Sequence, residues 1–221
     1  MLKTRVKTVI DRYDVRQRFL RSLGAPRRIL ELGCGRGTTA AAAQAMYPTA
    51  EIHGVDIFRE PGLPSTVVYQ TVDLDRDVLP YPDGHFDAIL FTHVIEHLRH
   101  PLSAAHEIGR VLAPGGRIYV ETPNWTSLLM PSFGVIKGGP FNFFDDPTHI
   151  RPWTKHSLYA FLDQKCRLSV LDVGTVRNLP RIPVDVFLTL RSPRSRKQLV
   201  ATFWNIYGWC IYGIGVKRTN A

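Results

Sequence analysis

The ten residues Ile-Leu-Glu-Leu-Gly-Cys-Gly-Arg-Gly-Thr, at positions 29–38, decide the fold of this 221-residue chain. The apolar run at 29–32 is typical of a parallel strand that is covered on both faces. Gly33, Gly35 and Gly37 predict a turn whose backbone a ligand can approach closely. The alanine-rich run after them predicts a helix from about Thr38. The unpaired N–H groups of its first turn favour a polar or anionic ligand.

A second predicted strand, Glu-Ile-His-Gly-Val-Asp at 51–56, ends in an acid. In a βαβ unit, an acid about 20 positions after the glycines accepts hydrogen bonds from the hydroxyls of a bound ribose, and Asp56 fits that position. A nicotinamide-binding protein can carry the same glycine turn. The two motifs therefore predict a ribose-containing ligand and leave its identity open.

Further strands and helices alternate along an α/β core that runs from Arg28 to about Val176. Pro101 suits the first turn of a helix that Pro114 and the next two glycines end, and Thr154 suits the N-cap of another helix. The remaining strands are predicted at 65–69, 86–91, 117–121 and 167–176, and the two helices at 101–112 and 155–164.

With these motifs in order, the chain resembles the class I S-adenosylmethionine-dependent methyltransferases. The matching motifs are Glu-Leu-Gly-Cys-Gly-Arg-Gly at 31–37, Gly-Val-Asp at 54–56, Pro-Asp-Gly-His-Phe-Asp at 82–87 and Leu-Ala-Pro-Gly-Gly at 112–116. The resemblance covers roughly residues 25–175 and argues against a nicotinamide enzyme. It implies an α/β fold with a Rossmann-like, doubly wound seven-stranded sheet, mostly parallel, whose antiparallel last strand is 210–216.

One methyltransferase domain is expected over residues 1–221. A helix within 1–24 either forms a lid over the cofactor or packs on the sheet. Residues 25–176 form the cofactor-binding core, and its aromatic-rich insertion at 123–153 is expected to cover the acceptor. Residues 177–221 form a basic and aromatic extension that includes the last strand.

The resemblance implies S-adenosyl-L-methionine as the cofactor and places its contacts at the carboxyl ends of the first four strands. The implied contacts are Glu31, Gly33 and Gly35 at the methionine end, Asp56 at the ribose, Ile57, Asp73 and Leu74 at the adenine, and Thr92 near the sulfonium.

The acceptor side carries three histidines and a carboxylate. His93, Glu96 and His97 follow a strand with i, i+3 and i+4 spacing, which would place them on one face of a helical turn. His149 lies in the insertion. Such a set can bind a divalent metal, or it can supply a general base with an orienting acid. In a purely structural role, Glu96 and His97 would only order the cofactor loop.

A narrower resemblance concerns the same residues. The small-RNA 3′-terminal ribose 2′-O-methyltransferases carry Glu-x-x-Glu-His on this turn and a later histidine, and together these hold a metal across a ribose diol. This chain has His93-Val-Ile-Glu96-His97, then Thr-Pro-Asn at 122–124, then His149. Ubiquinone-biosynthesis O-methyltransferases look similar over these elements. His93 replaces a glutamate of those families, so manganese or zinc becomes as plausible as magnesium.

These residues favour an O-methyltransferase that acts on a saccharide hydroxyl beside a second hydroxyl. A sugar hydroxyl is weakly acidic, so His149 or His93 is expected to act as general base, with Glu96 and His97 as metal ligands or orienting groups. Aromatic residues of the insertion are expected to stack on the sugar ring: Trp125, Phe141, Phe143 and Trp153.

Three alternative functions stay open. A lipid quinone or catechol acceptor would use the uncharged stretch 199–216 for peripheral contact with a membrane. An RNA 3′-end acceptor would use the basic ends and bind with a steep salt dependence, although no aromatic-basic nucleic-acid module is visible. A silent cofactor-binding scaffold would not need the histidine–glutamate set. The expected partner is a small-molecule or oligosaccharide acceptor, nucleic acid is not expected, and the resemblance suggests a homodimer.

Lysine and arginine concentrate at both ends of the chain, whose net charge is +9. Residues 1–28 carry nine Lys/Arg against two Asp/Glu, and residues 177–221 carry eight against one. Such ends can face phosphate, an anionic lipid surface or an acidic glycan, or form a solvated surface. Three cysteines without metal-like spacing, and a beginning without an apolar signal core, predict a cytoplasmic location. Residues 199–216 have the length of a membrane helix, but their glycines weaken that interpretation and their Trp and Tyr residues suit a membrane interface better than a bilayer centre. The family resemblance favours a strand at 210–216.

Overall fold

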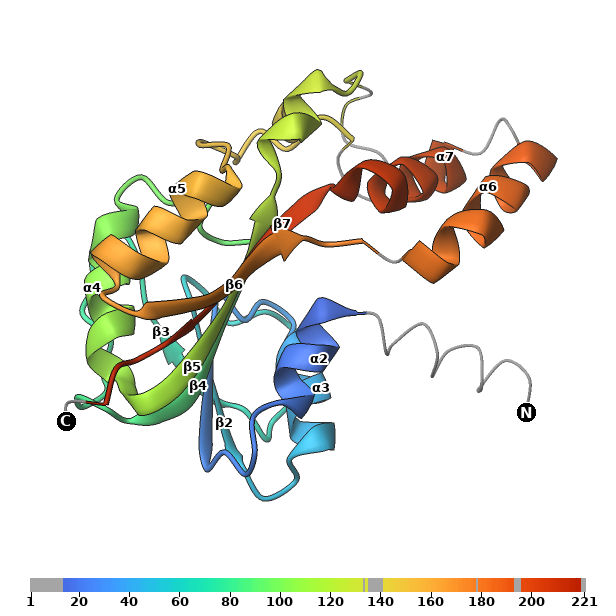
Figure 1. The fold of residues 1–221 in the computed structure, drawn as a ribbon. Helices are drawn as coiled ribbons and strands as arrows, with labels where there is room; N and C mark the ends of the chain where they lie inside the picture. Colours follow the sequence, from blue (N-terminus) through green and yellow to red (C-terminus); the bar gives the residue numbers. More distant parts are fainter. Residues whose placement is uncertain (1–13, 133, 135–140, 178, 193–195, 220–221) are drawn as a thin grey trace.

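The computed structural model describes residues 14–132, 134, 141–177, 179–192 and 196–219, and its centre is a seven-stranded sheet (Figure 1). The strand order is β3-β2-β1-β4-β5-β7-β6, in which β7 runs antiparallel to both of its neighbours and the other pairings are parallel. The fold predicted from the sequence is therefore confirmed. The strands are β1 (Arg28–Leu32), β2 (Glu51–Asp56), β3 (Val68–Thr71), β4 (Phe86–Thr92), β5 (Leu112–Pro123), β6 (Ser169–Thr175) and β7 (Cys210–Val216).

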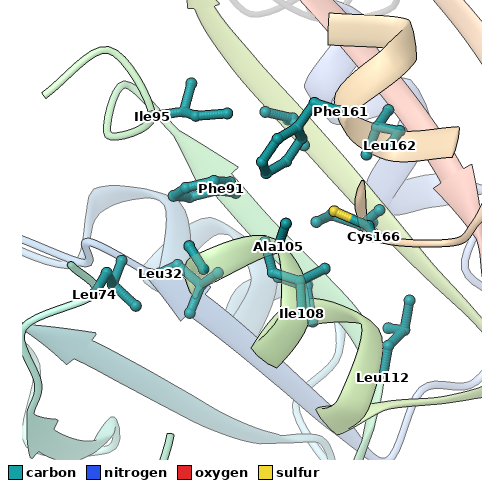
Figure 2. Packing of buried hydrophobic residues seen from close by; sticks show 14 of the residues in the cluster. Leu32, Leu74, Phe91, Ile95, Ala105, Ile108, Leu112, Phe161, Leu162 and Cys166 are labelled. Carbon is teal, nitrogen blue, oxygen red and sulfur yellow. The ribbon is translucent and has the colours of Figure 1, made fainter. Parts of the chain in front are cut away.

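Helices cover both faces of the sheet. Helices α2 and α3 lie on one face, and α4 and α5 on the other (Figure 1). The α4 side holds the larger apolar cluster, in which Phe91 and Leu32 of the sheet pack beneath Ile108 and Phe161 (Figure 2). The α-helices are α2 (Val15–Arg21), α3 (Thr38–Met46), α4 (Pro101–Val111), α5 (Lys155–Ala160), α6 (Ile182–Arg191) and α7 (Arg196–Phe203).

Four of the predicted elements differ from the observed ones by more than one residue at a boundary: β3, β5, β6 and the helix predicted at 155–164. Strand β3 begins at Val68 and not at residue 65, because the preceding residues form a turn that Val67 N–H closes on the carbonyl of Pro64. The Pro-Gly-Gly segment does not precede β5 but belongs to it, since Gly115 and Gly116 exchange backbone hydrogen bonds with Lys217.

The helix predicted at 155–164 changes to a π-helical turn, Phe161–Lys165, after α5, and β6 is shorter than the predicted strand at both ends. Of the helix expected within 1–24, the structure shows α2, and residues 1–13 lie outside the described part. Thr154 caps α5 as predicted, and its hydroxyl accepts a hydrogen bond from Ser157 N–H.

The extension after β6 forms a helical hairpin before it returns to the sheet. Helices α6 and α7 extend away from the sheet, and a π-helical turn, η5 (Trp204–Gly208), leads into β7 (Figure 1). The strand prediction for 210–216 is thus confirmed, and the membrane-helix alternative for 199–216 is wrong. Within the described ranges, none of the helices has the length and apolar content that crossing a bilayer requires.

Candidate active site

The glycine turn after β1 has the backbone conformation that glycine allows. Gly33, Gly35 and Gly37 have φ values of 69°, 46° and 72°. A side chain at Gly33 would place its Cβ 2.2 Å from Cγ2 of Val94, so that position has no room for one. This turn brings the loop after β4 close to the end of β1.

Asp56 closes the turn from the neighbouring strand. One carboxylate oxygen accepts a hydrogen bond from Gly35 N–H at 2.8 Å, and the other accepts one from Ile57 N–H at 2.8 Å. Ile57 is 61% exposed. This exposure leaves its side chain free to pack on the adenine of a bound cofactor. Asp73 and Thr92 follow at the ends of β3 and β4. The structure therefore places these predicted contacts along one edge of the sheet, and their contact with the cofactor stays a prediction.

Glu31 is buried at the end of β1, where it accepts a hydrogen bond from Ala40 N–H at the start of α3. Burial raises the pKa of Glu31 to about 7, although the hydrogen bonds from Thr39 and Ala40 oppose that rise. The carboxyl group is thus about half protonated near neutral pH. A cation beside it would favour the ionised form.

We expect the affinity for S-adenosylmethionine to increase by up to about tenfold from pH 6 to pH 8, because Glu31 must lose its proton to pair with the cationic methionine end. Calorimetric titration over this range measures the effect. Glu31→Gln should remove the pH dependence, whereas Glu51→Gln, at the opposite end of the sheet, should retain it. An affinity that does not change with pH in the unmodified protein contradicts the prediction.

The acceptor-side residues meet in one cavity of about 420 Å³. It lies beyond the carboxyl ends of β4 and β5, between the insertion and η5, and all four residues of the predicted set line it. The lining residues are His93, Glu96, His97, Glu121, Pro123, Asp146, His149, Val176, Trp204, Asn205, Trp209 and Cys210.

The segment after β4 forms a turn that does not include His93. The carbonyl of Val94 accepts a hydrogen bond from His97 N–H, whereas His93 has a left-handed backbone with φ 56°. His93 still contacts Glu96, but the three residues do not share one face of a helical turn. The polar residues form two groups, one with His93, Glu121 and Cys210 and one with Glu96, His97 and His149. Glu96 connects the two groups, because its carboxylate also lies 3.4 Å from His93. Glu121 and Cys210 are partners of His93 that the sequence did not suggest, and metal binding by the four predicted residues stays a prediction.

Both ring nitrogens of His93 face carboxylates. Nε2 lies 3.2 Å from Glu121 and Nδ1 lies 3.4 Å from Glu96. Partial burial lowers the pKa of His93, whose side chain is 44% exposed, but interactions with Cys210 and with the two carboxylates outweigh this effect and hold the pKa well above its ordinary value. A histidine that keeps its proton donates hydrogen bonds and cannot accept a proton, so the geometry argues against His93 as the general base.

Glu121 connects the pocket to the N-terminal helix. Arg16 of α2 contacts its carboxylate at 3.0 Å, and the hydroxyl of Tyr119 donates a hydrogen bond to it. Burial raises the pKa of Glu121, but the bond with His93 and the charge of Arg16 outweigh that effect and lower it to about 2. Because Phe19 also packs against Tyr119, with ring centroids 5.5 Å apart, α2 packs on the sheet.

His149 has the opposite arrangement from His93. Its Nδ1 is 2.6 Å from the carbonyl oxygen of Phe143, and a carbonyl can only accept, so Nδ1 carries the proton. When the ring is neutral, Nε2 therefore keeps a free lone pair. The carboxylate of Asp146 lies 3.8 Å from Nε2, beyond hydrogen-bonding distance.

His97 is oriented in the same way. Its Nδ1 lies 2.9 Å from Oγ1 of Thr148, and that hydroxyl donates its own proton to Asp146. The shared hydroxyl must therefore accept from His97, which leaves Nε2 of His97 with a free lone pair. In their neutral forms, the two imidazoles therefore both direct Nε2, and not Nδ1, as the nitrogen with a free lone pair, and both belong to one group with the Glu96 carboxylate.

Glu96 is fully buried. Its Oε2 accepts a hydrogen bond from the hydroxyl of Thr122 at 3.0 Å. Oε1 pairs with His93 at 3.4 Å, and among the described residues no donor makes a hydrogen bond to it. The imidazolium of His93 compensates part of the charge on Oε1. Because no hydrogen bond occupies this oxygen, it can still accept from a ligand or coordinate a cation.

The aromatic cover of the pocket differs from the predicted one. Phe141, Phe143 and Trp153 are buried, with at most 5% of each side chain exposed, so they cannot stack on an acceptor ring. Trp125 is 44% exposed. Trp204 and Trp209 of the extension instead form the aromatic wall, stacked on each other with ring centroids 5.3 Å apart.

Glu121, Arg16 and the two tryptophans were missed from the sequence. Glu121 had a usable signal, because it is the charged residue at the carboxyl end of a strand and pairs in register with Thr92 of β4. Arg16 and the two tryptophans had no such signal in the sequence, because their positions in the pocket depend on how the two ends of the chain fold back on the sheet.

Comparison with known proteins decides the family. A methyltransferase domain model matches residues 4–175, which is most of the chain. This chain belongs to the class I S-adenosylmethionine-dependent methyltransferases. The enzyme class and the cofactor implied by the sequence motifs are therefore confirmed, while the acceptor is not determined.

Two relatives and one solved structure illustrate the range of the family. The chain is 33% identical to Methyltransferase str2 of Strobilurus tenacellus, over 47% of this chain and 38% of that protein. It is 35% identical to the demethylmenaquinone methyltransferase of Thermus thermophilus, over 43% of this chain and 47% of that protein. The chain thus spans less than half the length of these curated relatives.

A chain of the complex between the Haloferax volcanii Trm112 methyltransferase activator and a methyltransferase has the same fold. The TM-score is 0.68 at 16% identity, over 98% of this chain and 95% of that chain.

Proposed function

We propose that this methyltransferase transfers the methyl group to a hydroxyl that has a second hydroxyl beside it, with a saccharide as the first acceptor to test. The observation that carries the proposal is the group of Glu96, His97 and His149, whose ligand atoms all lie within 4.8 Å of one another. The adjacent tryptophans provide an apolar wall for one face of a ring.

The reaction needs a proton to leave a weakly acidic hydroxyl while the oxygen attacks the methyl carbon in line with the sulfonium. His149 has the free Nε2 lone pair that this step requires, held in place by the carbonyl of Phe143. His93, cationic between its carboxylates, is suited to donate a hydrogen bond to the second hydroxyl. Both residues line the cavity.

The three residues also fit a divalent metal. Two imidazole nitrogens with free lone pairs and one buried carboxylate oxygen without a hydrogen bond form a donor set that suits manganese, zinc or iron better than magnesium. When bound, such an ion would lower the pKa of a coordinated hydroxyl. Glu96, His97 and His149 would hold it, and Thr122 and Thr148 would orient Glu96 and His97 through their hydrogen bonds. Because Nε2 of His149 has a single lone pair, His149 would then be a metal ligand and not the proton acceptor, so the metal route and the general-base route are alternatives.

A lipid catechol or quinol is the second candidate acceptor. Pro123, Val176 and the two tryptophans make one side of the cavity apolar, and one relative is by name a demethylmenaquinone methyltransferase. A catechol ring has two adjacent oxygens, as a sugar diol does. The polar residues of the pocket therefore do not distinguish a catechol acceptor from a saccharide acceptor.

Transfer of a labelled methyl group from S-adenosylmethionine into a panel of saccharides, catechols and RNA 3′ ends tests the proposal. Label is expected on oxygen, in an acceptor with adjacent hydroxyls, and should be absent from the matching deoxy or singly hydroxylated compound. Label on carbon, or equal labelling of the singly hydroxylated compound, would refute the diol assignment.

A further inference from the structure

Helix α6 is oriented with its apolar side chains outward. Phe187 is 55% exposed and Leu190 is 75% exposed, and Val184 and Leu188 lie on the same outer side. We call these four residues the α6 outer face. In most soluble domains the apolar side of a helix packs against the core. An exposed apolar side therefore indicates a surface that binds a membrane or another protein.

Polar residues fill the contact between α6 and α7. Asp185 is fully buried and accepts hydrogen bonds from Arg181 and from Asn205. The hydroxyls of Thr189 and Thr202 bond to each other at 2.7 Å. These hydrogen bonds determine which side of α6 faces α7. The apolar side chains on the opposite side of α6 are therefore held in an exposed position.

The charge around the α6 outer face has one sign. Asp185 is the only carboxylate side chain of residues 177–221, and it is buried. Arg177, Arg181 and Arg191 are exposed on the hairpin, and the guanidinium of Arg191 lies over the Phe187 ring at 5.5 Å. The part of the surface that residues 177–221 form therefore combines exposed leucine and phenylalanine with arginine and lacks an exposed acidic side chain. Arg181 is paired with the buried Asp185, so Arg177 and Arg191 carry the excess positive charge.

We propose that the α6 outer face docks on an anionic lipid bilayer. Apolar side chains enter the interfacial layer and arginines contact the acidic headgroups, which is the chemistry of interfacial helices. A second copy of this chain fits less well, because it would bring the same positive surface against itself. The proposal does not depend on which acceptor is methylated.

The hairpin that carries the α6 outer face also borders the acceptor cavity. The short turn η5 contributes Trp204 and Asn205 to the cavity, and Asn205 donates a hydrogen bond to Asp185 of α6.

Co-sedimentation of the full chain with vesicles tests the proposal. Phosphatidylcholine vesicles with about one-third phosphatidylglycerol should bind the protein, and pure phosphatidylcholine should bind it at least about tenfold more weakly. The double variant Phe187→Ser/Leu190→Ser should lower the partition coefficient on anionic vesicles by at least about tenfold, because it removes two inserting side chains.

The matched control is Val78→Ser/Leu102→Ser, which removes two apolar side chains that are 70% and 59% exposed on the body of the protein. It should bind like the unmodified chain, and both variants should keep the thermal midpoint and the cofactor affinity. Failure of the unmodified chain to bind anionic vesicles, or equal binding by the α6 variant, overturns the proposal. A dimer that the α6 variant dissociates, without vesicle binding, would assign the face to a second copy instead.

Discussion

Replacement of His149 by alanine is expected to lower methyl transfer by about two to four orders of magnitude, because the variant lacks the free Nε2 nitrogen in the acceptor cavity. The affinity for S-adenosylmethionine should stay within about twofold, since His149 contacts the insertion and not the glycine turn. Single-turnover transfer and calorimetric cofactor binding measure the two quantities separately.

His156→Ala is the matched control for this substitution. His156 is exposed on α5 and does not line the acceptor cavity, so its loss should leave transfer unchanged. Unchanged turnover in His149→Ala would remove His149 from the mechanism. Loss of both turnover and cofactor binding would mean that the substitution disturbs the fold, and His149→Asn, which keeps a polar side chain there, would then be measured in its place.

Substitution of Glu96 by glutamine is expected to abolish binding of manganese or zinc and to lower transfer by about 10- to 100-fold or more, because it removes the anionic ligand of the proposed metal group. The amide has the same shape and can still accept a hydrogen bond from Thr122, so the fold should persist. Metal content after dialysis, and transfer with and without a chelator, measure the effect.

Glu51→Gln is again the control, since Glu51 is half-exposed and remote from the cavity. If the unmodified enzyme retains full transfer after metal removal and Glu96→Gln remains active, the metal assignment is wrong. His149 would then act without a metal as the proton acceptor. If chelation stops transfer and one metal restores it, the triad of Glu96, His97 and His149 is supported directly.

The strands and the cofactor edge followed from local pattern. The apolar run before Gly33, the acid at Asp56 and the proline at Pro101 each restrict the backbone within a few residues, so β1, β2 and α4 begin within one residue of the predicted positions. The meeting of His93, Glu96 and His97 in a pocket was also predictable, because parallel strands bring their carboxyl ends to one edge.

Only the tertiary structure determines which histidine nitrogens in the pocket carry a proton and which have a free lone pair. Whether a histidine keeps a proton or a lone pair depends on the groups that face its two nitrogens, and these come from distant parts of the chain. Glu121 belongs to β5 and Arg16 lies 105 positions earlier. The same holds for α6, whose outward side is set by the polar contacts of Asp185 with a later helix and not by its own apolar pattern, which alone would predict a buried face.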